Sequence, residues 1–340
     1  MPGMGSFNSS PKVLLAAIAD YSTNATSAHL IYTSDYKNWS VACKIGGAGA
    51  SRGIAYDSTK KNLYVLTTDS PVSRVFKRSA VNGFRSLNAY SLKGAFSTSA
   101  AGNRLFVDSG RIMYGANNTI CYYSATEGDS WVSFNTWSSS ATRQPAVVRY
   151  FPSVDRYING MVTVTPMGVT NAGSAFNGGA WTGVTGSLAD PGWGSTTGRV
   201  WHVEEGNSAN FIAVGNITGA GKLSSSFDLC AWTNRTWVSA LIPRHVAWNG
   251  SMWVAVGNGG VIGTSTDING STWTSRTSPI ATNLCWVGWD TTKQIWIAVD
   301  LNFAVITSPD GIVWTNNSAV GTNFAMSQAT IIQMVRVDYP

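Results

Sequence analysis

Short apolar stretches separated by polar turns recur along the chain, most clearly near the C-terminus. Residues 244–275 read RHVAWNGSMWVAVGNGGVIGTSTDINGSTWTS, and residues 284–318 read LCWVGWDTTKQIWIAVDLNFAVITSPDGIVWTNNS. Each segment holds three stretches in which large apolar residues alternate with small or polar ones, followed by Ser-x-Asp and a Trp. Such alternation between turn signals predicts β-strands. The pattern therefore predicts a four-stranded antiparallel unit that is repeated along the sequence.

The aromatic residue near the end of each unit can be traced back through the whole chain. The two best-defined anchors, Trp273 and Trp314, are 41 residues apart. Seven anchors are expected in all: Trp39, Phe84, Trp131, Trp181, Trp232, Trp273 and Trp314. A period of about 40–50 residues is typical of β-propeller blades. We predict an all-β fold, a single seven-bladed β-propeller with four-stranded antiparallel blades; six blades are the alternative if the irregular fourth repeat is an insertion.

The expected boundaries follow from these anchors. An N-terminal tail, residues 1–11, precedes a propeller over residues 12–340. The blades are expected at about residues 12–47 together with 324–337, 50–92, 94–137, 145–186, 191–239, 243–278 and 281–318. The predicted second strands are residues 14–20, 63–69, 104–108, 161–166, 211–216, 253–258 and 296–300. Because no first strand precedes residues 14–20, the stretch 324–337 is predicted to supply it and to close the ring.

The turn before each anchor has a signature of its own. Four repeats carry it most clearly, in Ser34, Asp35 and Trp39; Ser226, Asp228 and Trp232; Ser265, Asp267 and Trp273; and Ser308, Asp310, Gly311 and Trp314. It resembles the Asp-box, or bacterial neuraminidase repeat, in which Ser or Thr, any residue and Asp are followed by Gly and an aromatic residue. The resemblance implies a turn between third and fourth strands, with the Asp bound to backbone N–H groups. These residues are expected to be structural and to lie opposite the functional face.

A second set of polar residues is expected on that functional face. Each predicted second strand except the fourth ends in Asp or Asn, at Asp20, Asp69, Asp108, Asn216, Asn258 and Asp300. These residues either cap the following turns or form a ring that binds a sugar or a hard cation. Arginines are expected beside them, at Arg52, Arg143, Arg199, Arg244 and Arg276, with Arg74 and Arg111 from other loops. They either pair with the ring or bind an anionic glycan or an acidic partner.

Composition narrows the function classes. Hydrophobic residues make up 44% of the chain and charged residues only 12%, about half the usual charged share. The net charge is +6, but the longest basic run is Lys60 and Lys61, so no nucleic-acid-binding stripe is predicted. Residues 1–11 lack the charged and apolar regions of a signal peptide, and no apolar run has the length of a membrane span. We expect neither a nucleic-acid partner nor membrane insertion.

Candidate metal and thiol chemistry is sparse. The cysteines are far apart and are expected in four different blades as free thiols, at Cys43, Cys121, Cys230 and Cys285. The three histidines, His29, His202 and His245, show no metal-ligand spacing. We therefore expect no metal site and no cofactor.

Sialidases share the Asp-box repeat. If this chain resembled them in activity too, the resemblance would imply an Arg-Ile-Pro element, an arginine triad and a tyrosine nucleophile assisted by a glutamate. This chain has no Arg-Ile-Pro, and its three glutamates, Glu127, Glu204 and Glu205, fall in predicted turns on the Asp-box side.

The low charge of the chain and its repeats of the form WVAVG…TSxDGxxW instead resemble bacteriophage structural proteins. That resemblance implies a non-enzymatic virion structural or receptor- or glycan-binding module of a phage tail, made in the host cytoplasm. The implied partners are other tail proteins, a symmetric oligomer or a host-surface glycan. The alternatives are a sialidase-like or other glycoside-active enzyme and a cytoplasmic protein-assembly factor.

Overall fold

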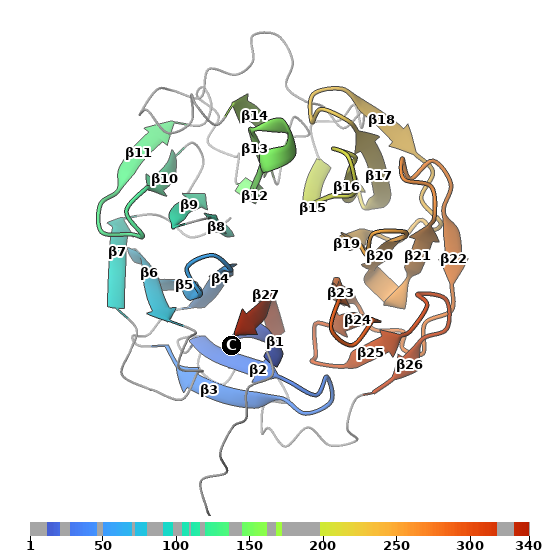
Figure 1. Cartoon of the computed structure of the whole chain (residues 1–340), viewed down its shortest axis with the longest axis horizontal. Helices are drawn as coiled ribbons and strands as arrows, with labels where there is room; N and C mark the ends of the chain where they lie inside the picture. Colours follow the sequence, from blue (N-terminus) through green and yellow to red (C-terminus); the bar gives the residue numbers. More distant parts are fainter. Residues whose placement is uncertain are drawn as a thin grey trace, which may run out of the picture.

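The computed structural model is a ring of β-sheets around a central axis (Figure 1). It describes residues 12–20, 28–45, 50–69, 72–79, 91–97, 104–108, 110–115, 120–135, 145–161, 168–171, 198–317 and 330–339. Within these ranges there are seven antiparallel sheets, six of four strands and one of three. No helix in the same ranges has the length and apolar character of a membrane span. The prediction of an all-β chain built from four-stranded antiparallel units is confirmed.

The sheets are numbered in chain order, and the strands of each are named from the axis outward. Sheet 1 contains β27 (Thr330–Tyr339), β1 (Lys12–Asp20), β2 (Ala28–Thr33) and β3 (Ser40–Lys44). Sheet 2 contains β4 (Ala50–Asp57), β5 (Asn62–Asp69), β6 (Val72–Ser79) and β7 (Ser91–Ser97). Sheet 3 contains β8 (Arg104–Asp108), β9 (Arg111–Gly115), β10 (Ile120–Ser124) and β11 (Val132–Asn135). Sheet 4 contains β12 (Pro145–Phe151), β13 (Arg156–Met161) and β14 (Gly168–Asn171), with the 3-10 turn η2 (Pro152–Val154) after β12.

The last three sheets form the right side of the ring in Figure 1. Sheet 5 contains β15 (Gly198–Glu205), β16 (Phe211–Ile217), β17 (Ala220–Ser226) and β18 (Trp232–Arg235). Sheet 6 contains β19 (Pro243–Trp248), β20 (Trp253–Gly257), β21 (Ile262–Ser265) and β22 (Thr274–Arg276), with the 3-10 turn η3 (Asn258–Gly260) after β20. Sheet 7 contains β23 (Leu284–Asp290), β24 (Ile295–Asp300), β25 (Val305–Ser308) and β26 (Thr315–Asn316).

The core is divided into layers between neighbouring sheets. On β20, Val254 and Val256 pack toward sheet 7, while Trp253 and Ala255 pack toward sheet 5. Successive side chains of a strand point to opposite faces, and both faces of this sheet are covered by neighbours. The second strands therefore read as nearly continuous apolar runs, because neither face is left to water.

The C-terminal strand closes the ring as predicted. β27 pairs antiparallel with β1, from Lys12 opposite Tyr339 to Asp20 opposite Thr330. Met334 of β27 packs against sheet 7, and Val337 packs against sheet 2. Both side chains are buried, and burying one of this size contributes about 1.5–3 kcal/mol. The strand begins at Thr330, and residues 324–329 of the predicted stretch lie outside the described residues.

Two strand assignments made from the sequence are wrong. Residues 104–108 form β8, the innermost strand of sheet 3, rather than its second strand. The tight turn after Asp108 contains Gly110 with φ 84°, so β8 and β9 form the first hairpin of this sheet. β7 consequently lies in sheet 2 and crosses the boundary expected near residues 92–94. In sheet 4 the second strand is β13, Arg156–Met161, rather than residues 161–166.

Candidate ligand-binding site

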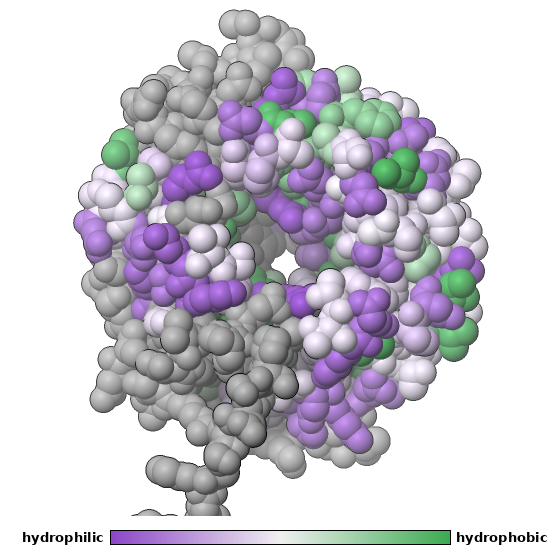
Figure 2. Space-filling model, viewed as in Figure 1, coloured by the Kyte–Doolittle hydropathy of each residue, from purple (hydrophilic) through white to green (hydrophobic). Residues whose placement is uncertain are grey.

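The antiparallel strands give the ring two rims. Connections from first to second and from third to fourth strands lie at one rim, which we call the Asp-box rim. Connections from second to third strands and from one sheet to the next lie at the opposite rim, which we call the Asp/Asn rim. Figure 2 shows the ring in space-filling form, open at its centre, with hydrophilic residues among those that border the opening.

The Asp-box turns are held by their own side chains. In sheet 7, the Asp310 carboxylate accepts hydrogen bonds from the backbone N–H groups of Val313 (2.9 Å) and Ile312 (2.8 Å). Those two bonds hold the pKa of Asp310 below its ordinary value. Ser308 Oγ accepts from Gly311 N (2.8 Å), and Trp314 Nε1 donates to Gly311 O (2.9 Å). Gly311 has φ 73°, a conformation that the absence of a Cβ makes easy.

Two further Asp-box turns repeat this arrangement. Asp228 accepts from the N–H groups of Cys230 and Ala231, both at 2.8 Å, and Trp232 Nε1 donates to Leu229 O at 2.9 Å. In the third turn, Asp267 accepts from Asn269 N at 2.9 Å, and Trp273 Nε1 donates to Gly270 O at 2.9 Å. The carboxylates of these turns thus accept hydrogen bonds from backbone N–H groups, as expected of structural residues.

The turn of sheet 1 shifts the predicted match by one residue. Thr33, not Ser34, stands in the Ser position, because Thr33 Oγ1 donates to Asp35 (3.0 Å) and accepts from Tyr36 N (3.1 Å). Tyr36 has φ 60° in the place of the glycine, and its hydroxyl donates to Asp290 of sheet 7 at 2.5 Å. Trp39 Nε1 donates to Phe303 O, also in sheet 7, at 3.0 Å. This turn therefore joins the sheet that closes the ring to its neighbour.

Sheet 3 forms the same turn without an Asp. Ser124 Oγ accepts from Gly128 N (2.8 Å), and Thr126 Oγ1 accepts from Ser130 N (2.9 Å) in place of the carboxylate. Trp131 Nε1 again donates to the backbone carbonyl three residues earlier, at 2.9 Å. The geometry of the motif therefore survives where its sequence is degenerate.

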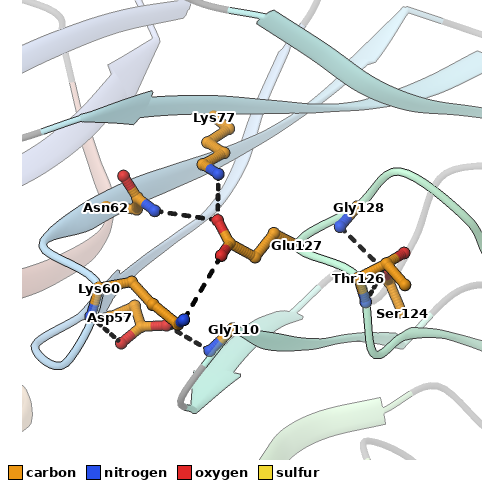
Figure 3. Close-up of polar contacts among 9 residues, drawn as sticks. All are labelled: Asp57, Lys60, Asn62, Lys77, Gly110, Ser124, Thr126, Glu127 and Gly128. Atoms are coloured by element: carbon orange, nitrogen blue, oxygen red, sulfur yellow. Dashed lines mark hydrogen bonds and ion pairs between the residues drawn. The ribbon is translucent and has the colours of Figure 1, made fainter.

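Glu127, in that turn, points across to sheet 2 (Figure 3). Its carboxylate pairs with Lys77, accepts a hydrogen bond from Asn62 (3.2 Å) and lies 3.9 Å from Lys60 Nζ. Nearby, the carboxylate of Asp57 accepts from Gly110 N at 2.5 Å, a second contact between these sheets. Glu127 is therefore engaged in joining two sheets.

The predicted ring of Asp and Asn residues is only partly assembled. Asp108 is misplaced: it stands opposite Arg111 in the β8–β9 hairpin and lies at the Asp-box rim with it. Asp300 is buried and accepts from the N–H groups of Asn302 (2.8 Å) and Ala304 (2.7 Å), so it caps its turn. Asp20 and Asp69 end β1 and β5 at the Asp/Asn rim, and only their backbone is described.

The predicted arginines also separate. Arg276 lies in β22 at the outer edge of sheet 6, where its Nε donates to Thr264 Oγ1 at 2.9 Å. Arg74 lies in β6, and Arg52 lies in the innermost strand β4, where only its backbone is described. Arg143 lies outside the described residues. Arg199 and Arg244 are the predicted arginines that the structure brings together.

The innermost strands share a feature that the sequence reading missed. Each of them except β8 has a register shift that leaves one residue unpaired, a β-bulge. The bulged residues are Arg52, Ala146, Trp201, Arg244, Cys285 and Ile332. Bulges redirect side chains and increase the local twist. They all occur near the Asp/Asn rim, so this rim carries one extra residue per affected strand.

Two of these bulges build a cluster between sheets 5 and 6. The guanidinium carbon of Arg199 lies 3.9 Å from the centre of the Trp201 ring, and that of Arg244 lies 4.3 Å from it. Trp201 Nε1 donates to Asn216 Oδ1 (2.9 Å), and Arg244 Nε donates to Asn258 Oδ1 (2.6 Å). All five residues are partly exposed. Two of the predicted Asn residues therefore orient an aromatic ring and a cation.

The cluster concentrates positive charge. Since both guanidinium carbons lie within 4.3 Å of one ring centre, they are separated by at most about 8 Å. At an effective dielectric constant of about 20, two unit charges at that separation or less repel by at least about 2 kcal/mol. No ion pair joins Arg244 to a carboxylate within the described ranges. Burial lowers the pKa of its guanidinium, which nevertheless stays charged at neutral pH.

Further aromatic and charged side chains of the innermost strands β15, β19 and β23 lie between the cluster and the Asp-box rim. The rings of His202 and His245 are stacked at 3.7 Å, and Trp286 lies 5.9 Å from His245. Glu204 binds Arg149 of sheet 4 through two hydrogen bonds of 2.8 Å. Within the described ranges, no three His, Cys, Asp or Glu side chains form a group that could hold a metal ion.

Trp201 is the cluster residue that the sequence reading did not select. The available signal was Arg-x-Trp at the start of a predicted first strand. Alternation places Arg199 and Trp201 on one face of β15, but neither the bulge at Trp201 nor the approach of Arg244 from the next sheet can be read from this strand alone.

No protein-family model and no curated protein matches this chain. Solved structures do. A putative 6-phosphogluconolactonase from Bacteroides fragilis is 10% identical with a TM-score of 0.66, covering 98% of this chain and 100% of that one. YCF48 from Cyanidioschyzon merolae is 14% identical with a TM-score of 0.55, covering 86% and 96%. YCF48 bound to D1 peptide is 11% identical with a TM-score of 0.56, covering 83% and 90%. At such identities the likeness concerns the fold alone, and that fold is a β-propeller.

Proposed function

We propose that this protein is a non-enzymatic binding module that receives a glycan at the Asp/Asn rim. We place it in a virus particle, as part of a bacteriophage tail, with other tail proteins as partners. The setting rests on the low charge of the chain and on the resemblance of its repeats to phage structural proteins. The binding surface rests on one observation, the stack of Arg199 and Arg244 on Trp201.

We infer seven blades, one for each described sheet. Sheet 4 has three described strands, and the region in which a fourth would follow, residues 172–197, lies outside the described residues. The stretch between β14 and β15 is long enough for that strand. The Asp-box anchor predicted at Trp181 falls in it.

The use of the carboxylates favours binding over hydrolysis. Most glycoside hydrolases need two carboxyl groups on either side of the scissile bond. Glu127 and Glu204 form ion pairs between sheets, and Asp300 caps a turn. None of these three belongs to the Arg–Trp cluster. The glycoside-active alternative would therefore need a pair of acids other than these.

The full-length protein should be tested on a glycan array and on fluorogenic glycosides. We expect binding without turnover, and loss of binding in Arg244→Ala but not in Arg276→Ala. Arg276 is a matched control because it carries the same charge at the outer edge of the same sheet. Turnover abolished by Arg244→Ala would establish the glycoside-active alternative.

The phage setting has its own test. Mass spectrometry of purified particles should find the chain at a fixed copy number relative to the tail proteins. Absence from the particles, together with a pull-down that captures a newly made host protein, would instead favour the assembly-factor alternative.

A further inference from the structure

We propose that Arg244, stacked on Trp201 beside Arg199, binds the oxyanion, a carboxylate or a sulfate, of an acidic glycan. Trp201 would hold the two guanidinium groups at the junction of β15 and β19. The proposal rests on the proposed glycan-binding function and names the ligand class. β15 and β19 are neighbours on the inner side of the ring (Figure 1).

The Arg244 guanidinium uses one of its three nitrogens in a hydrogen bond within the protein. Asn258 Oδ1 accepts from Nε at 2.6 Å, so that the two terminal nitrogens are left to face a ligand. A guanidinium with both terminal nitrogens available matches the two oxygens of a carboxylate or two oxygens of a sulfate. Arg244 is a better receptor than a lysine would be, because its donors form a planar fork.

Trp201 fixes the orientation of the cations before any ligand arrives. Its indole N–H is held by Asn216 Oδ1 at 2.9 Å, so the ring itself is anchored. Arginine stacked on an indole is stabilised by the cation–π interaction. Less side-chain entropy is then lost when an anion binds.

Charge supplies the selectivity. Arg199 and Arg244 lie on one ring, and no described carboxylate forms an ion pair with Arg244. A bound oxyanion would pair with the Arg244 guanidinium and compensate its charge. A neutral sugar would bring no negative charge to this guanidinium, so acidic glycans should bind more tightly than neutral ones.

The test measures binding of the full-length protein to three immobilised polysaccharides at an ionic strength of about 0.15 M. Polygalacturonate offers carboxylates, dextran sulfate offers sulfates, and dextran is neutral. We expect saturable binding to one or both acidic polymers and none to dextran. The two acidic polymers distinguish the source of the oxyanion.

Variants decide whether the cluster is responsible. We expect binding at least about tenfold weaker in Arg244→Ala, and weaker also in Arg244→Lys, which keeps the charge but loses the fork. Arg276→Ala lowers the net charge equally and should bind like the wild type. Arg244→Lys guards against a misfolded Arg244→Ala, and the thermal midpoint of each variant is recorded.

Three outcomes would overturn the proposal. Equal weakening by Arg244→Ala and Arg276→Ala would show that net charge alone attracts the polymer. Binding of dextran, unaffected by Arg244→Ala, would leave the glycan-binding function standing and remove the oxyanion site. Binding of none of the three, and of nothing on a wider glycan array, would remove both.

Discussion

The two rims of the ring use polar side chains in different ways. At the Asp-box rim, carboxylates accept from backbone N–H groups, as Asp310 does, or join neighbouring sheets, as Glu127 does. At the Asp/Asn rim between sheets 5 and 6, Asn216 and Asn258 instead orient Trp201 and Arg244. Polar residues at repeated positions therefore serve the fold when the backbone takes up their hydrogen bonds. They serve a candidate site when they accept from side chains and so orient them, as Asn216 does for Trp201 and Asn258 for Arg244.

Removing the closing strand should destroy both rims. Deletion of residues 330–340 takes away β27, leaves β1 as a bare edge and exposes the surfaces that cover Met334 and Val337. Two such side chains correspond to about 3–6 kcal/mol of burial, against a usual total stability of about 5–15 kcal/mol. We expect aggregation, measured by light scattering, or loss of cooperative unfolding, measured by calorimetry. Deletion of Pro340 alone is the control, and a monomeric truncated protein with an unchanged melting curve would contradict ring closure by β27.

Breaking one ion pair near the Asp-box rim should weaken the ring without opening it. Glu204→Ala leaves the half-buried Arg149 without the carboxylate that accepts two of its hydrogen bonds, while the bond to Val203 O remains. Hydrogen bonds to charged groups contribute about 1.5–3 kcal/mol, so we expect a loss of about 2 kcal/mol in urea denaturation. The double variant Arg149→Ala/Glu204→Ala should lose less than the sum of the two single variants. Strict additivity would show that the pair does not join sheets 4 and 5.

Strong acid should weaken the turns of the Asp-box rim. Burial alone would raise the pKa of Asp35, but hydrogen bonds from Asn38 and Lys37 N–H groups, among others, lower it to about 2. A pKa lowered in the folded state adds stability that is complete above the unfolded value of about 3.9 and is lost as pH falls toward 2. The free energy of unfolding should therefore decrease between about pH 4 and pH 2. Asp35→Asn should show a shallower dependence, and an unchanged pH profile in this variant would contradict the assignment.

The smallest effect on stability is expected at the Asp/Asn rim. Arg244→Gln removes a stacked cation but also removes its repulsion with Arg199, so the free energy of unfolding should change by less than about 1 kcal/mol. Added sulfate should raise the melting temperature of the wild type more than that of the variant, because a ligand stabilises the state that binds it. Comparison with sodium chloride at equal ionic strength controls for screening. A loss as large as that of Glu204→Ala would make Arg244 a structural residue.

Much of the fold was predictable because it depends on short-range patterns. The alternation around Trp253 and the Asp-box ending at Trp314 identify strands and turns, and the expected pairing of a C-terminal strand with β1 is confirmed. Asp108 was misplaced because its tight turn is only two residues long, so a first hairpin resembled a single second strand. The Arg–Trp cluster could not be derived, since a β-bulge depends on the register between two strands. The sequence of either strand alone does not specify that register.

The bulges have a consequence for how this ring can change. A bulged residue on an innermost strand is left unpaired in the ladder of hydrogen bonds beside it. Six such positions surround the axis, and they hold Arg, Ala, Trp, Arg, Cys and Ile. We expect exchange at Trp201 and Arg244 to be coupled, because these two side chains are stacked, while bulges that do not touch each other can change separately and the sheets stay the same. The ring would then act as a fixed frame with interchangeable contacts.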